Sequence, residues 1–403
     1  MRSGLVARLR RAYEKNVDEW LALARGHMPG FVAGRAGGLA GETPVFCFHE
    51  VEPGRFERQL RHLHQNGYPS VDASELEQLL RSPGAARRQV ALSFDDATSS
   101  FWTYAFPLLR HYGCRAILFA IPGLVPDDET EYPTLDDLWR GRATPEELAA
   151  RAHTQPLCTW RELRAMHASG VVDVQSHSMT HSRVATGPRL VDFYHRGYPI
   201  ERYGAVNVPI SSLHDPLRAE RWPWPGAPIF ENAPRTAGRP RFLEPRALDE
   251  ALAAHVAVRG GERFFAQEGW RRELEALVAQ FSPGRRGRYE TEAETRRALV
   301  WELGESKRLL EERLPGKLVT QFCYPWFQGS ALSDRLAGEV GYAAVHYGLR
   351  LPRDRAPGSQ IPLPIRRISD DYLLRLPGEG RLPLRAIWRE RTASSLARLR
   401  AAG

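Results

Sequence analysis

The feature that most constrains the fold is a short apolar run that ends on two adjacent carboxylates. Residues 89–98 read Gln-Val-Ala-Leu-Ser-Phe-Asp-Asp-Ala-Thr. The part before Asp95 is typical of a strand buried on both faces, as in a parallel sheet. Paired acids at the carboxyl end of such a strand predict an α/β active site, in which Asp96 or Asp95 holds a metal and its neighbour acts as a base. The alternative is a turn in which aspartate caps the next helix.

The flanking sequence continues as strands alternating with amphipathic helices. This alternation predicts parallel strand pairing with right-handed crossovers. The expected strands are 45–49, 89–94, 116–121, 171–175, 318–324, 342–347 and 365–369, and the expected helices include 56–65, 74–80, 101–112, 160–168, 247–257, 270–281, 291–313 and 331–339.

The bulk properties narrow the class of protein. A length of 403 residues suits a large α/β domain with insertions. The net charge of +8 favours an anionic partner, but the arginines are scattered and no basic tract has interleaved aromatics, so no nucleic-acid partner is expected. The four cysteines form no Cys-x-x-Cys pair, which fits a reducing compartment. Without an apolar signal core or an apolar run of membrane-spanning length, the chain is expected to be cytoplasmic.

Five segments are expected along the chain. Residues 1–41 hold an N-terminal helix over 4–25 and a Gly/Ala-rich linker from residue 30, and residues 42–181 form the first part of the α/β domain. Residues 182–317 are an insertion, and residues 318–381 complete the domain. Residues 382–403 form a basic amphipathic helix that favours peripheral contact with an anionic membrane surface.

A pair of histidines follows the strand expected at 171–175. His177 and His181 have the His-x-x-x-His spacing, which puts both rings on one side of a helical turn and lets two nitrogens reach one metal. A carboxylate from elsewhere would complete a two-histidine, one-carboxylate site. The alternative is that the two histidines have this spacing by chance or for a structural reason. The aspartate pair and the histidine pair both follow expected strands of the same α/β pattern, which argues against coincidence.

These motifs resemble those of the polysaccharide deacetylases, the family of the NodB-homology fold. Ser-Phe-Asp-Asp at 93–96 and His-Ser-Met-Thr-His at 177–181 are similar to the first two family motifs. Phe-Cys-Tyr-Pro-Trp at 322–326 resembles the third, and Phe-His-Glu-Val at 48–51 resembles the segment upstream of the first. The resemblance covers residues 44–121 and 159–181, and more loosely 318–369.

The resemblance implies a distorted (β/α) barrel with a large inserted cap. It also implies one divalent metal, most often Zn²⁺ with Co²⁺, Ni²⁺ or Mn²⁺ as alternatives, held by Asp96, His177 and His181. Asp95 would then be the general base. An oxyanion donor is expected at the Trp326 N–H, after Tyr324 and Pro325, and Ser178 is expected to steady the metal loop.

Three departures from the family pattern leave roles open. Ala97 stands where the family usually has glycine. The arginine that braces the base in many members is missing from the third motif, so Arg366 or Arg367 is a candidate replacement, against the alternative of a surface ion pair. No histidine follows His346 in the place of the family's general acid, so His49 and His346 are both candidates.

The function expected is metal-dependent removal of an N-acyl group, such as acetyl, from an amino-sugar. The substrate would be a nucleotide-linked or lipid-linked sugar or an oligosaccharide. Residues 210–242 are expected to cap the site, with the Trp326 ring and the Trp222–Pro225 segment for sugar rings and with Arg221, Arg235 and Arg239 for phosphate or carboxylate. The alternatives are a purely structural cap, a catalytically silent carbohydrate-binding relative, and a hydrolase of a non-sugar amide.

Overall fold

The computed structural model of the chain describes residues 19, 21–23, 25, 28–34, 39, 41–82, 88–211, 223–281, 287–355 and 362–401, with side chains to residue 392. Most of the helix expected over 4–25 lies outside these residues. No described helix has the length and apolar character needed to cross a bilayer.

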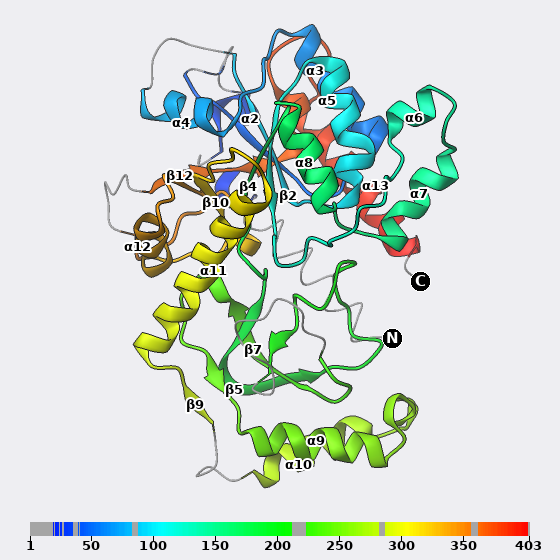
Figure 1. Ribbon diagram of the computed structural model, residues 1–403, viewed down its shortest axis with the longest axis vertical. Helices are drawn as coiled ribbons and strands as arrows, with labels where there is room; N and C mark the ends of the chain where they lie inside the picture. The colour runs from blue at the N-terminus through cyan, green and yellow to red at the C-terminus, as the bar shows by residue number, and fades with distance from the viewer. Residues whose placement is uncertain are drawn as a thin grey trace.

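The core of the protein is a sheet of eight parallel strands in the order β12-β11-β10-β4-β3-β2-β1-β13 (Figure 1). Arg367 alone separates β12 from β13, which stand at opposite ends of this order, so the two ends of the sheet meet at one residue. The sheet is therefore a nearly closed barrel, as predicted. Its strands are β1 (Val45–Phe48), β2 (Ala91–Asp96), β3 (Ala116–Ala120), β4 (Val172–Ser176), β10 (Gln321–Cys323), β11 (Ala344–Tyr347), β12 (Leu363–Arg366) and β13 (Ile368–Ser369).

The strand register brings the motif-bearing strand ends to one edge of the barrel. Asp96 pairs with Ala120, Ala120 with Ser176, and Ser176 with Phe322. All six residues of β2 are buried, because the strand is covered on both faces. The residues that follow β2, β4 and β10 therefore emerge side by side at the carboxyl edge, where α/β proteins build their sites.

Helices cover the outside of the barrel (Figure 1). The helix expected from Ser74 begins at Ala73, because the Asp72 side chain accepts the Glu75 N–H and forms a capping box. The stretch expected as one helix over 101–112 begins with a π-helical turn, Phe101–Ala105. These helices are α3 (Pro53–Gln65), α4 (Ala73–Arg81), α5 (Phe106–Tyr112), α6 (Leu135–Trp139), α7 (Pro145–Thr154), α8 (Trp160–Ala168), α11 (Glu292–Arg313), α12 (Ala331–Val340) and α13 (Leu384–Ala401).

The two ends of the chain pack differently from the sequence expectation. The expected linker contains a short helix, α2 (Gly30–Ala33), whose Phe31 and Val32 are fully buried, so apolar burial overrides the Gly/Ala-rich composition there. In α13, Ile387 is buried, and Arg391 forms ion pairs with Glu19 and Asp371. Part of the polar face of α13 therefore forms ion pairs with other segments of the chain.

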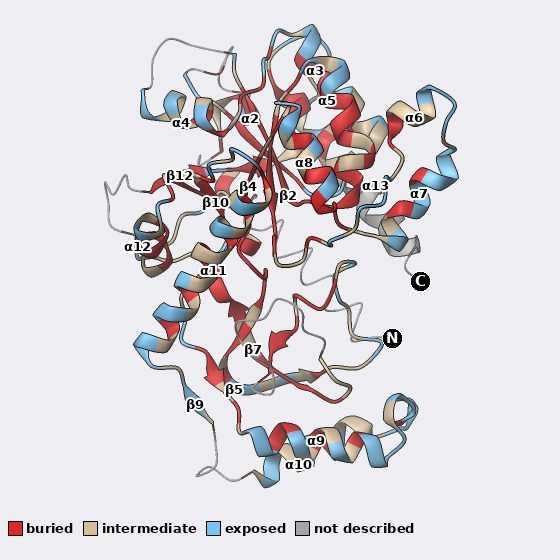
Figure 2. Ribbon diagram, viewed as in Figure 1, coloured by how far each residue is buried: buried red, intermediate tan, exposed pale blue. Residues whose placement is uncertain are grey.

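The insertion forms a separate lobe beyond the carboxyl edge (Figures 1 and 2). It contains a three-stranded sheet in the order β6-β5-β7 and two packed helices, which bury Leu252 and Leu274 at their contact side. Its elements are β5 (Arg183–Phe193), β6 (Pro209–Ile210), β7 (Pro228–Pro234), β8 (Phe242–Leu243), α9 (Arg246–Val258), α10 (Trp270–Gln280) and β9 (Arg288–Tyr289).

Helix α11 links this lobe to the barrel. It contacts β4 and α12 of the barrel layer, and its Ser306 hydroxyl hydrogen-bonds the Ser176 hydroxyl at 2.6 Å. Its Leu303 is fully buried, whereas Val300 on the same helix is 37% exposed. The helix therefore belongs structurally to the barrel, although the sequence division placed it with the insertion.

Replacing Leu303 by alanine is expected to lower the free energy of unfolding by about 2–5 kcal/mol, because it opens a cavity between α11 and the barrel core. The matched change Val300→Ala on the exposed side should cost less than about 0.5 kcal/mol. Denaturant unfolding of both variants checks this. Similar losses in the two variants would mean that α11 does not pack as described.

Candidate metal and catalytic site

Three side chains converge beyond the carboxyl ends of β2 and β4. The Nε2 atoms of His177 and His181 lie 3.4 Å and 3.6 Å from Asp96 Oδ1, and all three residues are buried. The spacing of the two histidines predicted that they share a helical turn, and this prediction is wrong. They lie on a loop in which Ser178 and His181 have positive φ values of 66° and 50°, which a right-handed helix excludes.

Hydrogen bonds fix the orientation of both rings. The His177 Nδ1–H donates to the Cys323 carbonyl at 2.9 Å, so in the neutral form of this ring the Nε2 lone pair faces Asp96. The Ser178 hydroxyl accepts the His181 N–H at 2.9 Å and so shapes the loop. Burial lowers the pKa of His181 to about 3, despite the nearby Asp96 carboxylate, so this ring is neutral near pH 7.

The donor set fits a divalent metal ion. Asp96 Oδ1 is buried and has no hydrogen-bond partner among the described residues, although a buried carboxylate oxygen normally has one. Burial raises the pKa of Asp96, but the adjacent imidazoles of His177 and His181, which stabilise the carboxylate when they are protonated, bring it down to about 2. One ionised carboxylate and two imidazole nitrogens therefore face a common point, a ligand set that suits Zn²⁺ and other first-row metals.

The neighbouring acid, Asp95, is held by a buried arginine. Arg367 donates to both carboxylate oxygens, with Nη1–Oδ1 at 2.6 Å and Nη2–Oδ2 at 2.8 Å. Burial alone would raise the pKa of Asp95, but Arg367 and His177 hold it far below the usual carboxyl range. Arg366 is exposed and points elsewhere. Of the two arginines proposed from the sequence, the structure places Arg367 on Asp95.

The two candidate acids occupy different surroundings. His49 Nε2 lies 3.7 Å from Asp95 Oδ2, and its side chain is 46% exposed. His346 is fully buried, and its Nε2 hydrogen-bonds Gln321 Oε1 at 2.8 Å. His346 therefore has no open path to a substrate in this conformation, whereas His49 does.

The third motif forms the wall next to the metal ligands. The Trp326 ring lies against His181, with centroids 4.1 Å apart, and the Arg183 guanidinium stacks over it at 4.9 Å. The Tyr324 hydroxyl is buried and donates to Asp334 of α12 at 2.7 Å, so it faces that helix rather than the site. Pro325 is buried at the start of the 3₁₀ turn Pro325–Phe327, which sets the position of the Trp326 backbone.

The backbone around the site is strained at several non-glycine residues. Asp96, Ala97, Trp326 and Phe327 all have φ between 50° and 69°. Each such residue costs about 1–2 kcal/mol relative to the right-handed region. Ala97 thus occupies a conformation in which glycine is unstrained, a physical reason for glycine at this position in related sequences.

Two residues of the site carry no local sequence signal. Glu302 on α11 is buried, accepts the Thr180 N–H at 3.0 Å and also binds the Thr180 hydroxyl, so it anchors the histidine loop. Tyr203 from the insertion lies next to His181, with ring centroids 6.4 Å apart. Burial, followed by the nearby Asp96 carboxylate, raises its pKa well above that of free tyrosine.

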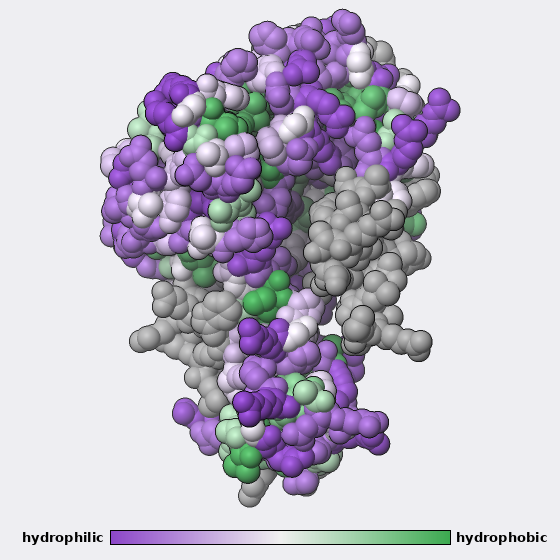
Figure 3. All heavy atoms as spheres, turned by 90° about the vertical axis from the view of Figure 1, so that its right-hand side faces the viewer, coloured by the Kyte–Doolittle hydropathy of each residue, from purple (hydrophilic) through white to green (hydrophobic). Residues whose placement is uncertain are grey.

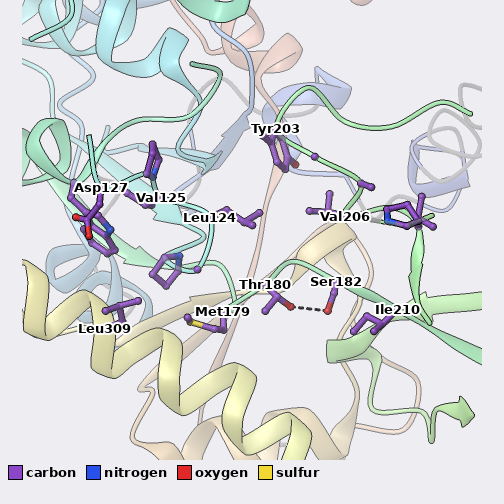
Figure 4. A pocket seen from close by; sticks show the side chains of 18 of the residues that line it. Leu124, Val125, Asp127, Met179, Thr180, Ser182, Tyr203, Val206, Ile210 and Leu309 are labelled. Atoms are coloured by element: carbon purple, nitrogen blue, oxygen red, sulfur yellow. Dashed lines mark hydrogen bonds between the residues drawn. The ribbon is translucent and has the colours of Figure 1, made fainter. Parts of the chain in front are cut away.

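Two pockets flank the site. One, of about 1110 Å³, lies behind the histidine loop between Leu124, Met179, Tyr203 and Leu309 and is mostly apolar (Figure 4). The other, of about 850 Å³, includes His49, Cys47, Trp326 and Arg367 in its lining, so it lies next to Asp95, which His49 and Arg367 contact. Figure 3 shows a mainly hydrophilic surface over the barrel, with a hydrophobic patch at the level of the junction between barrel and insertion.

Arg239 from the insertion and Arg353 from the loop after β11 also line the second pocket. Both are exposed, and neither has an ion-pair partner within the described part of the chain. Arg235, by contrast, is buried and paired with Glu290 at 2.8 Å, so it is not available to a ligand. Arg221 and Trp222, expected in the cap, lie outside the described residues.

The variant Arg367→Met is expected to lower the free energy of unfolding by about 3–5 kcal/mol, because it leaves the Asp95 carboxylate buried without a cation. Its exposed neighbour provides the control, since Arg366→Met should change stability by less than about 0.5 kcal/mol. Chemical denaturation measures both. A small effect at Arg367 would contradict the buried ion pair.

Comparison with known proteins agrees with the motifs. The family model described as polysaccharide deacetylase matches residues 83–191. The poly-beta-1,6-N-acetyl-D-glucosamine N-deacetylase of Escherichia coli (strain K12) is 26% identical over 174 residues, which cover 42% of this chain and 24% of the relative. The putative polysaccharide deacetylase YxkH of Bacillus subtilis (strain 168) is 28% identical over 89 residues, 20% of this chain and 32% of the relative. The matches thus span a third or less of these relatives.

Solved structures give more distant similarities. A de-N-acetylase from Aggregatibacter actinomycetemcomitans has a TM-score of 0.46 at 14% identity, covering 81% of this chain and 94% of that one. IcaB from Ammonifex degensii has a TM-score of 0.43 at 17% identity, covering 84% and 97%. Residues 83–191, with both acids and both histidines, resemble a polysaccharide deacetylase domain.

Proposed function

We propose that the protein is a metal-dependent hydrolase that removes an N-acyl group, acetyl in the simplest case, from an amino-sugar. The observation that carries this proposal is the convergence of Asp96, His177 and His181 beside a second carboxylate, Asp95, whose partners His49 and Arg367 line a pocket of about 850 Å³. Zn²⁺ is the cation that best suits this ligand set. The metal, when bound, supplies Lewis acidity to the amide carbonyl and lowers the pKa of water.

Residues of the chain are proposed to accept the proton of the attacking water and to stabilise the oxyanion. Asp95 is ionised because Arg367 stabilises its charge, so a carboxylate oxygen can accept a proton from the attacking water. The Trp326 N–H is proposed to donate to the oxyanion that forms on the carbonyl, and the Trp326 ring to support the sugar. Arg367 also keeps the Asp95 carboxylate in one orientation.

The leaving amine needs a proton, and we propose His49 as its donor. Its exposed ring lies 3.7 Å from Asp95, at the edge of the pocket, so it can reach a bound substrate. His346 is the weaker candidate, because it is sealed in the barrel by Gln321 and Phe119.

The pocket favours a substrate that carries negative charge. Arg239 and Arg353 present guanidinium groups on the same pocket as His49 and Trp326, and such groups suit phosphate or carboxylate. Of the three acids among its described lining residues, Asp370 and Glu19 are held by Arg55 and Arg391, and Asp354 accepts the Ala331 N–H at 3.2 Å. A nucleotide-linked or lipid-linked amino-sugar fits this arrangement better than a neutral polymer.

The cytoplasmic location and the peripheral membrane contact expected for residues 382–403 stay predictions. Arg385 and Arg389 are exposed and available for an anionic surface, whereas Arg391 is engaged in ion pairs. A catalytically silent relative and a hydrolase of a non-sugar amide remain the competing functions. The experiments below separate them from the proposed one.

Removal of the metal with a chelator should abolish release of acetate from N-acetylated sugars, and adding Zn²⁺ back should restore it. The variant Asp95→Asn should lower kcat by roughly 10²–10⁴-fold, as for loss of a general base, while metal content stays unchanged. The surface variant Asp136→Asn serves as the control. Wild-type protein that binds metal but releases no acetate from any N-acyl sugar would favour a silent relative or a different amide substrate.

Replacing either Arg239 or Arg353 by alanine should raise KM for a phosphate-bearing N-acetylated sugar by roughly tenfold to a hundredfold, since each lost hydrogen bond to a charged group is worth about 1.5–3 kcal/mol. The KM for the same sugar without phosphate should change little. Initial-rate measurements on the two substrates check this. An equal change for both would show that the two arginines do not read the charge.

A further inference from the structure

A second group of metal-ligating atoms lies on the opposite side of Asp95 from the first. Cys47 Sγ is 3.6 Å and His49 Nε2 is 3.7 Å from Asp95 Oδ2, and the three donor atoms all lie within 4.8 Å of one another. The strand register explains the meeting. Cys47 pairs with Ser93, and since side chains alternate along a strand, Cys47, His49 and Asp95 project to the same face of adjacent strands.

We propose that Cys47, His49 and Asp95 form a second metal site, distinct from the site at Asp96, which takes a thiophilic divalent cation such as Zn²⁺ or Cd²⁺ and inhibits the enzyme when it is filled. The inhibitory effect rests on the proposed function, because coordination would occupy both the base and the proton donor. The site itself does not depend on that function.

The site is reachable from solvent. Cys47 and His49 both line the 850 Å³ pocket, and the His49 side chain is 46% exposed, so its ring can turn without unpacking the core. Zinc-ligand distances are about 2.0–2.3 Å, so a cation placed between atoms separated by 3.6–3.7 Å needs only small side-chain movements. A fourth position remains open to water.

Arg367 sets the chemical preference of the site. Its guanidinium bonds Asp95 Oδ2 at 2.8 Å and therefore repels a cation placed nearby. A thiolate ligand offsets this repulsion with its own charge and with a strong bond to a soft cation, which Mg²⁺ and Ca²⁺ do not form. Arg367 also contacts Cys323 Sγ at 2.8 Å, so it covers the thiol on the other side of Asp95. The cation is accordingly expected at Cys47, not at Cys323.

The test is a titration of metal-free protein with Co²⁺ as a spectroscopic probe and with Zn²⁺ for stoichiometry. Wild-type protein should bind a second equivalent of either metal, and the cobalt form should gain a thiolate-to-cobalt charge-transfer band. Cys47→Ser should lose both the band and the second equivalent, and His49→Ala, at an exposed position, should weaken both. Cys114→Ser, at a buried thiol between α5 and β3, should keep them.

The band should persist in His181→Ala, which removes a ligand of the first site only. The activity of each protein is compared with the value that the same protein shows with one metal equivalent bound. On this scale, excess Zn²⁺ should lower the activity of the wild type and of Cys114→Ser but not that of Cys47→Ser. Excess Mg²⁺ should have no such effect. The second site would be overturned if saturated wild-type protein bound only one equivalent of metal. It would also be overturned if the charge-transfer band survived Cys47→Ser or was lost only in Cys323→Ser. A band with no Zn²⁺ inhibition would overturn the inhibitory role and leave deacetylation itself untouched.

Discussion

The buried ion pair between Asp95 and Arg367 is the interaction on which the rest of the site depends. Its partners are 272 residues apart, and the side chains are 2% and 0% exposed. Burying two charges is costly unless they are paired with good geometry, so the bidentate contact is a requirement as much as a gain. Because Arg367 is also the residue between the two end strands of the sheet, barrel closure and the ionisation of Asp95 are one structural event.

Two adjacent carboxylates thereby acquire different properties. Asp95 faces Arg367 on one side of the strand end, and Asp96, in the left-handed region with φ of 69°, turns toward the histidines. The strained backbone at Asp96 and Ala97 separates the two side chains. In a strand with ordinary backbone angles, the side chains of Asp95 and Asp96 would point to opposite faces of the sheet, and the strand would continue in the same direction. The strain is compensated by the buried polar contacts on both sides.

The insertion and the outer helices complete the site from a distance. Glu302 of α11 holds the histidine loop through Thr180, and Tyr203 of the insertion closes the side next to His181. Arg239 brings positive charge to the pocket that His49 opens. The barrel thus supplies the reactive groups, and the inserted lobe supplies surfaces that select what meets them. This division agrees with the general observation that specificity in such folds varies with the loops.

The sequence by itself indicated an α/β domain with parallel strands and, through the family resemblance, a barrel with Asp96, His177 and His181 as metal ligands. Apolar periodicity and strand-end motifs are local patterns, and parallel strands necessarily carry their carboxyl ends to one edge. The loop conformation of His177 and His181 was not visible, because the same spacing fits a helical turn and only the positive φ values exclude it. Nor could the sequence choose between Arg366 and Arg367 or between His49 and His346. Which side chain faces inward depends on where the sheet closes and on what packs against each strand, and tertiary structure alone decides both.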